Sequence, residues 1–310
     1  MSDSLAPPAG FRIGHWTDAV GRTGCTVVIA PEGTRGGVDV RGGGPGTRET
    51  DVASPLAGTD RVSAVVFAGG SAYGLAAADG AMRWLEEHGM GYPTPAALVP
   101  IVPAAIAYDL AEGDASARPT AESGYAACEA AREGVPERGR VGAGTGTAAG
   151  KVLGRGAATP SGVGYAAVRG GFGATVAALA VANPFGDVLA ADGSLLAGAR
   201  GDGAPRTVEF IAALDRAPSI EELEARNTTL VCVMTSASLD KAGCSRVARA
   251  ASAGVARAVE PVFTDVDGDV VFCLASGGGE LTGRFELLQL ETLSARVTAE
   301  AIRDAVTSAK

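Results

Sequence analysis

The chain is best understood from one stretch, ARNTTLVCVM at residues 225–234. An acidic, helix-prone segment, SIEELE at residues 219–224, precedes it, and the apolar run typical of a buried strand follows Asn227 at once. At such a boundary a chain can cut itself and expose a new N-terminal threonine, Thr228. The α-amine of that threonine, with a reference pKa of about 7.7 to 8.0, can take the proton of its own hydroxyl near neutral pH. The alternative is that Asn227 merely ends a helix and that Thr228 and Thr229 open a strand.

The composition is that of an ordinary globular protein. The chain has 310 residues, of which 46% are hydrophobic and 20% are charged, so it can bury one large core or two smaller ones. Its 45 glycines show no three-residue period, which indicates many tight turns and not a fibre. The net charge of −9 argues against nucleic acid or an anionic membrane as a partner, because binding to phosphate rests mainly on Lys and Arg.

Cysteine and histidine usage disfavours several kinds of site. The five cysteines are widely spaced and mostly set in apolar runs, which predicts small core residues in a reducing compartment without disulfides. The two histidines, His15 and His88, lie in poor settings for a Ser-His-Asp or Cys-His site. The chain has no CxxC or HxxxH pattern, so we expect no metal and no cofactor. Because residues 1–10 do not resemble a signal peptide and no apolar run is long enough to span a bilayer, we expect a cytoplasmic protein.

A glycine turn follows the second of two predicted strands, which lie at residues 25–30 and 62–68. A helical pattern begins directly after this turn. Gly70 and Ser71 in the turn can present backbone N–H groups to a negative or developing negative charge. The alternative is a tight turn that packs against the sheet.

A second glycine-rich segment, residues 142–152, suggests a nucleotide-binding loop but has the wrong spacing. A P-loop needs glycine where Thr145 stands and a serine or threonine where Val152 follows the lysine. The dinucleotide-binding pattern fails at Thr147. We therefore expect a flexible loop that presents one lysine, Lys151.

Polar residues also stand at the ends of two predicted strands. Asn183 closes the apolar strand 175–182 before a proline, so its amide can point at an oxyanion or simply begin a turn. Asp267 and Asp269 enclose a glycine before another apolar run, which is a hairpin signal. Acids two apart on extended backbone also point the same way, so this pair can orient a nucleophile or hold an α-ammonium group.

The remaining elements alternate between strands and helices without an internal repeat, heptad or low-complexity segment. They are predicted as strands at residues 98–102 and 230–235, helices at 120–132, 239–259 and about 285–307, and a hairpin with a surface loop at 187–218.

Seven stretches in this order resemble one family, the self-cleaving N-terminal-nucleophile aminopeptidases and amidases. This family includes L-aminopeptidase/D-esterases, β-peptidyl aminopeptidases and nylon-oligomer hydrolases. The resemblance runs from Ile13 to the end of the chain. The matching stretches are residues 24–27, 40–51, 68–75, 142–151, 183–184, 227–229 and 267–269.

The resemblance implies a single α/β (α+β) domain over residues 1–310 with four layers, αββα. It also implies that the precursor cuts itself between Asn227 and Thr228, giving an α chain of residues 1–227 and a β chain of residues 228–310 that stay together. A tetramer of such αβ units is the expected assembly. Ornithine acetyltransferases share this fold, so an acyl transferase and an inactive binding protein remain as alternatives.

The resemblance also assigns roles to single residues. These are Thr228 as nucleophile, Asp267 and Asp269 as the acids that orient it, Lys151 and Asn183 as groups that position it and the oxyanion, and Tyr73 on the pocket wall. A threonine with two aspartates resembles the nylon-oligomer branch, although Phe263 stands where that branch often has histidine. The expected substrates are small peptides or ω-amino-acid oligomers, bound through a free amino end.

Overall fold

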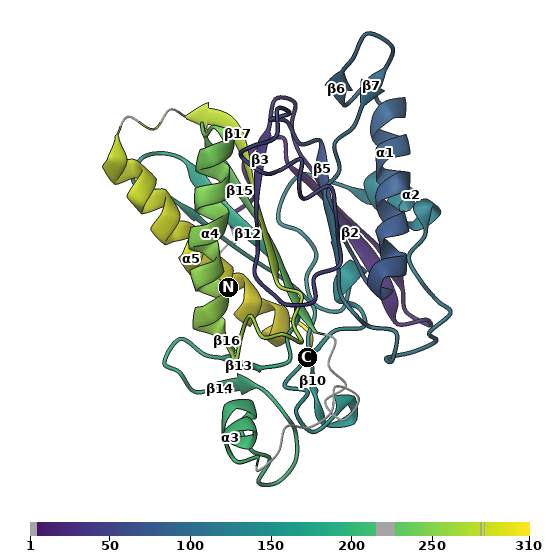
Figure 1. The fold of residues 1–310 in the computed structure, drawn as a ribbon, viewed down its shortest axis with the longest axis vertical. Coiled ribbons are helices and arrows are strands. Elements are labelled where there is room, and N and C mark those ends of the chain that lie inside the picture. Colours follow the sequence, from purple (N-terminus) through teal and green to yellow (C-terminus); the bar gives the residue numbers. More distant parts are fainter. Residues whose placement is uncertain (1–4, 215–226, 280, 282) are drawn as a thin grey trace.

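Two five-stranded sheets form the centre of the molecule and lie face to face, with helices on the outer face of each (Figure 1). The computed structural model describes residues 5–214, 227–279, 281 and 283–310. The predicted four-layer αββα fold is confirmed by this arrangement. The helix-prone segment 219–224 lies outside the described residues.

The first sheet has the strand order β1-β2-β5-β8-β4. Its strands are β1 (Arg12–Asp18), β2 (Thr23–Ile29), β4 (Thr47–Arg48), β5 (Ala64–Ala68) and β8 (Ala104–Ile106). Helices α1 (Ala77–Glu87) and α2 (Ala121–Ala130) pack on its outer face. Helix α2 begins at Thr120 because the side chain of this residue accepts a hydrogen bond from the N–H of Ser123.

The second sheet has the order β11-β12-β15-β17-β3. Its strands are β3 (Arg35–Val40), β11 (Val163–Arg169), β12 (Thr175–Asn183), β15 (Thr228–Ala237) and β17 (Val270–Gly279). Helices α4 (Lys241–Ala258) and α5 (Arg284–Thr307) cover its outer face. Strands β15 and β17 are parallel, and the other neighbours in this sheet are antiparallel.

Side chains from both sheets meet in a core between them. The rings of Phe67 on β5 and Phe272 on β17 lie 6.1 Å apart, centroid to centroid, within this core. Strands β12 and β15 are buried on both faces, by the opposite sheet on one side and by helices on the other. This double burial explains why their sequences are continuous apolar runs without alternation.

The short elements lie outside the two sheets. They are β6 (Tyr92–Pro93), β7 (Leu98–Val99), β9 (Ala148–Ala149), β10 (Thr159–Pro160), β13 (Asp187–Leu189), β14 (Leu195–Ala197), β16 (Val259–Glu260), α3 (Thr207–Ala212) and 3₁₀ turns at Ser71–Ala76, Gly142–Gly144 and Arg155–Ala157. The predicted hairpin after residue 187 is confirmed by the antiparallel pair β13–β14.

One predicted strand is misplaced. Of residues 98–102 only Leu98–Val99 forms a strand, β7, which pairs with β6 in a two-stranded sheet, whereas the strand of the first five-stranded sheet is β8 at Ala104–Ile106. Pro100 and Pro103 explain the shift, since proline has no N–H to donate to a neighbouring strand.

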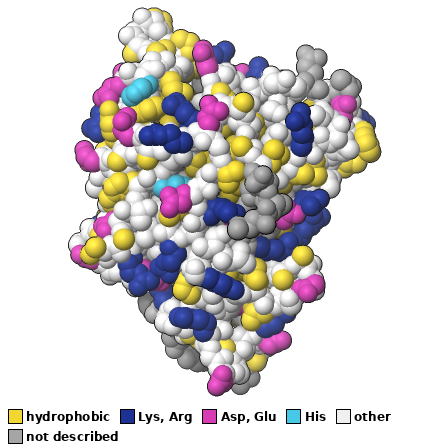
Figure 2. Space-filling model, turned by 180° about the vertical axis from the view of Figure 1, so that it is seen from behind, with side chains coloured by type: hydrophobic (Ala, Val, Ile, Leu, Met, Phe, Trp, Pro, Cys, Tyr) yellow, Lys and Arg dark blue, Asp and Glu magenta, His cyan; other side chains and the backbone are white. Residues whose placement is uncertain are grey.

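The surface seen from behind carries charges of both signs. In Figure 2 the Lys and Arg side chains are most numerous in the middle and lower part of this face, with acidic side chains scattered among them. The negative net charge is therefore not concentrated here. No helix in the described part of the chain is both long enough and apolar enough to cross a membrane.

Candidate functional site

The register of the second sheet brings the predicted site residues to one end of it. Thr228 is the first residue of β15, and it pairs with Asn183, the last residue of β12. Asn227, just before the strand, forms a parallel bridge with Asp267, just before β17. The strand pairing thus brings these four residues together, and all four side chains are buried.

The peptide bond between Asn227 and Thr228 has an unusual pair of contacts. The hydroxyl of Thr228 donates to the carbonyl oxygen of Asn227, with 2.5 Å between the oxygens. The backbone N–H of Gly268 donates to the same carbonyl oxygen at 2.8 Å. The Thr228 hydroxyl thus lies against the carbonyl of the preceding peptide bond, and a backbone N–H polarises that carbonyl.

Asp267 is fixed by groups of the protein on both of its oxygens. Oδ1 accepts from the N–H of Phe185 at 3.3 Å, and Oδ2 accepts from the hydroxyl of Thr264 at 2.6 Å. Burial raises the pKa of this carboxyl, and these hydrogen bonds oppose the rise. The hairpin that the sequence signal predicts is not formed here, since β17 pairs with β15 and β3. The residues before β17 form a turn instead, in which the N–H of Asp267 donates to the carbonyl of Thr264.

Asp269 accepts two backbone hydrogen bonds. Its Oδ1 lies 2.5 Å from the nitrogen of Thr229, and its Oδ2 lies 3.2 Å from the nitrogen of Phe263. Phe263 has a φ of 58°, a strained conformation for a bulky residue, and in it the N–H of Phe263 reaches the carboxylate. Burial and the charge of Asp267 raise the pKa of Asp269 to about 7. A small change in this environment therefore decides whether Asp269 is ionised at neutral pH.

Lys151 is fully buried and holds the backbone around the site. Its Nζ donates to the carbonyls of Asn183 at 2.7 Å and Pro184 at 3.2 Å and to Oδ1 of Asn227 at 2.9 Å. These three contacts use every donor of an ammonium group. The expectation of a flexible loop presenting this lysine is therefore wrong, because the lysine points inward and is fixed.

The charge of Lys151 is set by opposing effects. Burial lowers its pKa well below the ordinary value, and the nearby Arg155 lowers it further. The carboxylate of Asp267 opposes both effects. Lys151 donates its three hydrogen bonds to oxygen atoms that belong to the site, so its main structural effect is to orient Asn227 and the end of β12.

Asn183 lies at the end of its strand, as predicted, but its amide is used inside the protein. Oδ1 accepts from the N–H of Ala148 at 3.2 Å, and Nδ2 donates to the carbonyl of Tyr108 at 3.1 Å. Its side chain therefore ties two loops to the strand end, with Oδ1 and one N–H of Nδ2 used inside the protein.

Gly70 and Ser71 were predicted either to bind a negative charge through their N–H groups or to form a tight turn, and the structure shows the tight turn. The N–H of Gly70 donates to Asp109 Oδ1 at 2.6 Å, and the N–H of Ser71 donates to the carbonyl of Ala107 at 3.1 Å. Both residues have positive φ angles, of 77° and 55°. Their N–H groups are thus already occupied within the protein.

A cavity of about 330 Å³ lies beside Thr228. Its wall includes Asn227, Thr228, Ser71, Tyr108 and Asp265. Tyr73 lies outside this lining: its side chain is 60% exposed, and the guanidinium of Arg118 sits 3.7 Å above its ring. Of the three residues predicted for substrate binding, only Ser71 lines the cavity.

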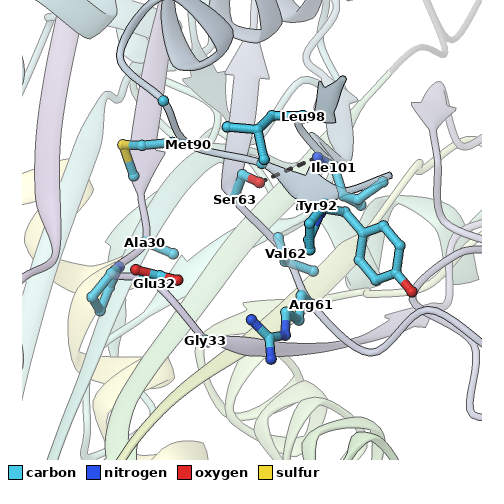
Figure 3. A pocket seen from close by; sticks show the side chains of 14 residues that line it. Ala30, Glu32, Gly33, Arg61, Val62, Ser63, Met90, Tyr92, Leu98 and Ile101 are labelled. Atoms are coloured by element: carbon cyan, nitrogen blue, oxygen red, sulfur yellow. Dashed lines mark hydrogen bonds between the residues drawn. The ribbon is translucent and has the colours of Figure 1, made fainter. Parts of the chain in front are cut away.

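A second, smaller cavity of about 160 Å³ lies elsewhere and contains none of the predicted site residues. Figure 3 shows Met90 and Leu98 on one side of it and Arg61 on the other, with a hydrogen bond from the N–H of Ile101 to Ser63. It has no enclosed nucleophile or acid pair among its lining residues, so the site at Thr228 is the better candidate for chemistry.

Backbone contributions of three glycines to the site were not predicted from the sequence. The first is the N–H of Gly268, which no side-chain pattern reveals. The second is the packing of Gly42, where an added Cβ would lie 2.2 Å from the carbonyl oxygen of Asp267 and 2.4 Å from the nitrogen of Asp269. The N–H of Gly44 also donates to the carbonyl of Asp267 at 2.8 Å. The glycine-rich loop therefore supports the turn that carries both acids.

Comparisons with known proteins agree on one family. Residues 4–310 match the model of the family described as peptidase family S58. An uncharacterized aminopeptidase of Mycobacterium leprae is 43% identical over 306 residues, covering 90% of this chain and 80% of that protein. A 6-aminohexanoate-oligomer endohydrolase of Agromyces sp. (strain KY5R) is 30% identical over 311 residues, covering 97% of this chain and 84% of that protein. The solved L-aminopeptidase D-Ala-esterase/amidase of Ochrobactrum anthropi, a variant of the Ntn hydrolase fold, matches with a TM-score of 0.73 and 18% identity over 99% of this chain and 88% of that chain.

Proposed function

The chain belongs to peptidase family S58, and from that premise we propose that it cuts itself before Thr228 and then hydrolyses amides with Thr228 as nucleophile. The observation that carries this proposal is the carbonyl oxygen of Asn227, which accepts hydrogen bonds from the Thr228 hydroxyl at 2.5 Å and the Gly268 N–H at 2.8 Å. Negative charge develops on this oxygen when the carbonyl carbon is attacked, and a fixed N–H donor stabilises that charge.

Self-cleavage follows in two steps. Oγ1 of Thr228 bonds to the carbonyl carbon of Asn227, the C–N bond breaks, and the nitrogen of Thr228 takes the hydroxyl proton. The resulting ester joins Asn227 to Oγ1 of Thr228. Water then hydrolyses the ester, which leaves a carboxylate on Asn227 and returns the hydroxyl of Thr228. Lys151 supports the first step because it holds the Asn227 side chain at 2.9 Å.

In the mature enzyme the freed α-amine of Thr228 acts as the base. It takes the proton of Oγ1 as this oxygen attacks the carbonyl of a substrate amide, and it returns the proton to the leaving amine. Water then hydrolyses the acyl ester. Asp267 and Asp269 support this role, because the hydrogen bonds that their oxygens accept near the start of β15 favour the ionised carboxylates and oppose the effect of burial.

Small peptides or ω-amino-acid oligomers with a free amino end are the proposed substrates. The names of the relatives, an aminopeptidase and a 6-aminohexanoate-oligomer endohydrolase, support this class. Asp267 and Asp269 are enclosed and hydrogen-bonded, so they do not face a substrate ammonium group. Asp265 is exposed and lines the cavity beside Thr228, which makes it the more accessible partner for such a group.

Denaturing mass spectrometry of the purified protein tests the proposal. Two fragments are expected, and the smaller one should begin at Thr228. The same preparation should hydrolyse amino-acid p-nitroanilides. A single full-length chain after long incubation, without hydrolysis, would refute both parts.

The pH dependence of the mature enzyme reports on the base. kcat/KM should rise with pH as the α-ammonium of Thr228 loses its proton. The charge of Asp269 favours the ammonium and raises its pKa, so Asp269→Asn should move the rising limb to lower pH by about one unit or more. Asp192→Asn is the matched control, because this carboxylate is exposed in the turn between β13 and β14 and does not line the cavity, so the substitution should shift the limb much less.

Each variant is first checked for complete cleavage, so that failed maturation is not mistaken for failed catalysis. The substrate titrates identically in every measurement, so only differences between the proteins are interpreted. Identical profiles for the wild type and Asp269→Asn would exclude the α-amine beside this acid as the titrating base.

A further inference from the structure

We propose that the place of Asn227 in the uncleaved chain becomes the acyl subsite of the mature enzyme. In this subsite the Gly268 N–H binds the acyl oxygen, and Lys151 binds a hydrogen-bond acceptor on the acyl side chain. The inference rests on the proposed self-cleavage, and it names the acyl group that the site prefers.

The chemistry of the two reactions supports one shared subsite. The self-cleavage intermediate is an ester between the Asn227 acyl group and Oγ1 of Thr228. Turnover forms the same ester, with the substrate acyl group in place of Asn227. In both reactions the negative charge develops on the oxygen of the acyl carbon that Oγ1 attacks. A donor placed for the first reaction is therefore placed for the second, because Oγ1 is common to both.

Two donors of the protein define the subsite around Asn227. Its carbonyl oxygen accepts from the Gly268 N–H at 2.8 Å, and its Oδ1 accepts from Lys151 Nζ at 2.9 Å. Its Nδ2 is buried and has no partner within the described part of the chain. The subsite therefore recognises the acceptor atom of the side chain and leaves the NH₂ group unrecognised.

The subsite is also connected to the open space of the site. Asn227 lines the cavity of about 330 Å³ together with Thr228. When Asn227 moves out, the volume of its side chain joins this cavity. A substrate can then enter with its carbonyl near Oγ1 and its acyl side chain near Lys151.

Electrostatics favour the departure of Asn227 after the cut. Cleavage gives Asn227 a carboxylate beside the buried Asp267 and Asp269, and it gives Thr228 an α-ammonium group. A third carboxylate beside these two acids places like charges together in a low-dielectric interior, which disfavours its staying there.

The preferred substrates are therefore amides whose acyl side chain is short and carries an acceptor where asparagine has Oδ1. Leucine supplies the matched comparison, because it branches at the same carbon and has a similar shape without the acceptor. A buried lysine whose partner lacks an acceptor is left with an unmade hydrogen bond. This lost hydrogen bond should make kcat/KM much lower for the leucine acyl group than for the asparagine acyl group.

The test measures kcat/KM of the fully cleaved wild type on the p-nitroanilides of L-asparagine and L-leucine. A preference for asparagine of roughly 10- to 100-fold is expected from one hydrogen bond to a charged group. In Lys151→Met, which has a similar length without the donor, the preference should fall to near one. If this variant fails to mature, the wild-type ratio alone decides.

The outcomes separate the inference from the function on which it rests. If the wild type is cleaved and active but has equal rates on both substrates, the proposed acyl subsite is refuted and the proposed hydrolase function is retained. A preference that persists in mature Lys151→Met would assign the acceptor to another group and overturn the role of Lys151. An uncut and inactive wild type would overturn both proposals.

Discussion

Thr228→Ala is expected to leave the chain uncut and to lower amide hydrolysis by about 10⁴-fold or more, because it removes the proposed nucleophile of both reactions. Thr228→Ser keeps a hydroxyl and a future α-amine, so it should still cut. The measurements are denaturing mass spectrometry and p-nitroanilide hydrolysis on the same preparations.

Thr229→Ala is the matched control for this change. It removes a buried hydroxyl one residue away from the proposed nucleophile. It also keeps the N–H that donates to Asp269. Cleavage and activity should therefore survive in Thr229→Ala. Loss of cleavage in this variant with retention in Thr228→Ala would move the nucleophile to Thr229.

Gly268→Ala is expected to slow self-cleavage by about 10²- to 10³-fold, the usual effect of losing one oxyanion donor. An added Cβ would lie 2.8 Å from the carbonyl oxygen of Gly44 and 3.2 Å from Oγ1 of Thr228. The backbone must shift to relieve the first contact, and the shift moves the N–H of Gly268 away from the Asn227 carbonyl. The rate is followed as the appearance of the fragment that begins at Thr228.

Gly58→Ala controls for a methyl group added to a loop glycine, because nothing lies within 4 Å of its added Cβ. It should cut at the wild-type rate. Thermal unfolding of both variants shows whether Gly268→Ala is folded when its cleavage is measured. Wild-type cleavage in folded Gly268→Ala would remove this N–H from the mechanism.

The sheet strands that are buried on both faces were the most predictable parts of the fold. Residues 175–182 and 230–235 are continuous apolar runs, and both are central strands of the second sheet. The strand near residue 100 was misplaced because the apolar pattern continues through Pro100 and Pro103, whereas neither proline has an N–H to donate to a neighbouring strand.

The site was less predictable from sequence for two physical reasons. A glycine-rich segment normally indicates an exposed loop, yet Lys151 in such a segment is buried, because the carbonyls at the end of β12 and the amide of Asn227 satisfy its donors. The N–H of Gly268 belongs to the backbone of a residue without a side chain. Its function depends on the bridge between Asn227 and Asp267, which joins distant parts of the sequence.

The position of β15 inside its sheet has a consequence for the stability of the protein after the proposed cut. The strand is hydrogen-bonded to β12 on one side and to β17 on the other, and β17 in turn pairs with β3. With the proposed cut before Thr228, the α chain would supply β12 and β3 and the β chain would supply β15 and β17, so the two chains would interleave within one sheet. Separating them would require the sheet to unfold, and reassembly would then depend on the concentration of two molecules instead of one. The proposed cleavage would therefore convert one chain into a two-chain complex whose persistence is set by how slowly it unfolds.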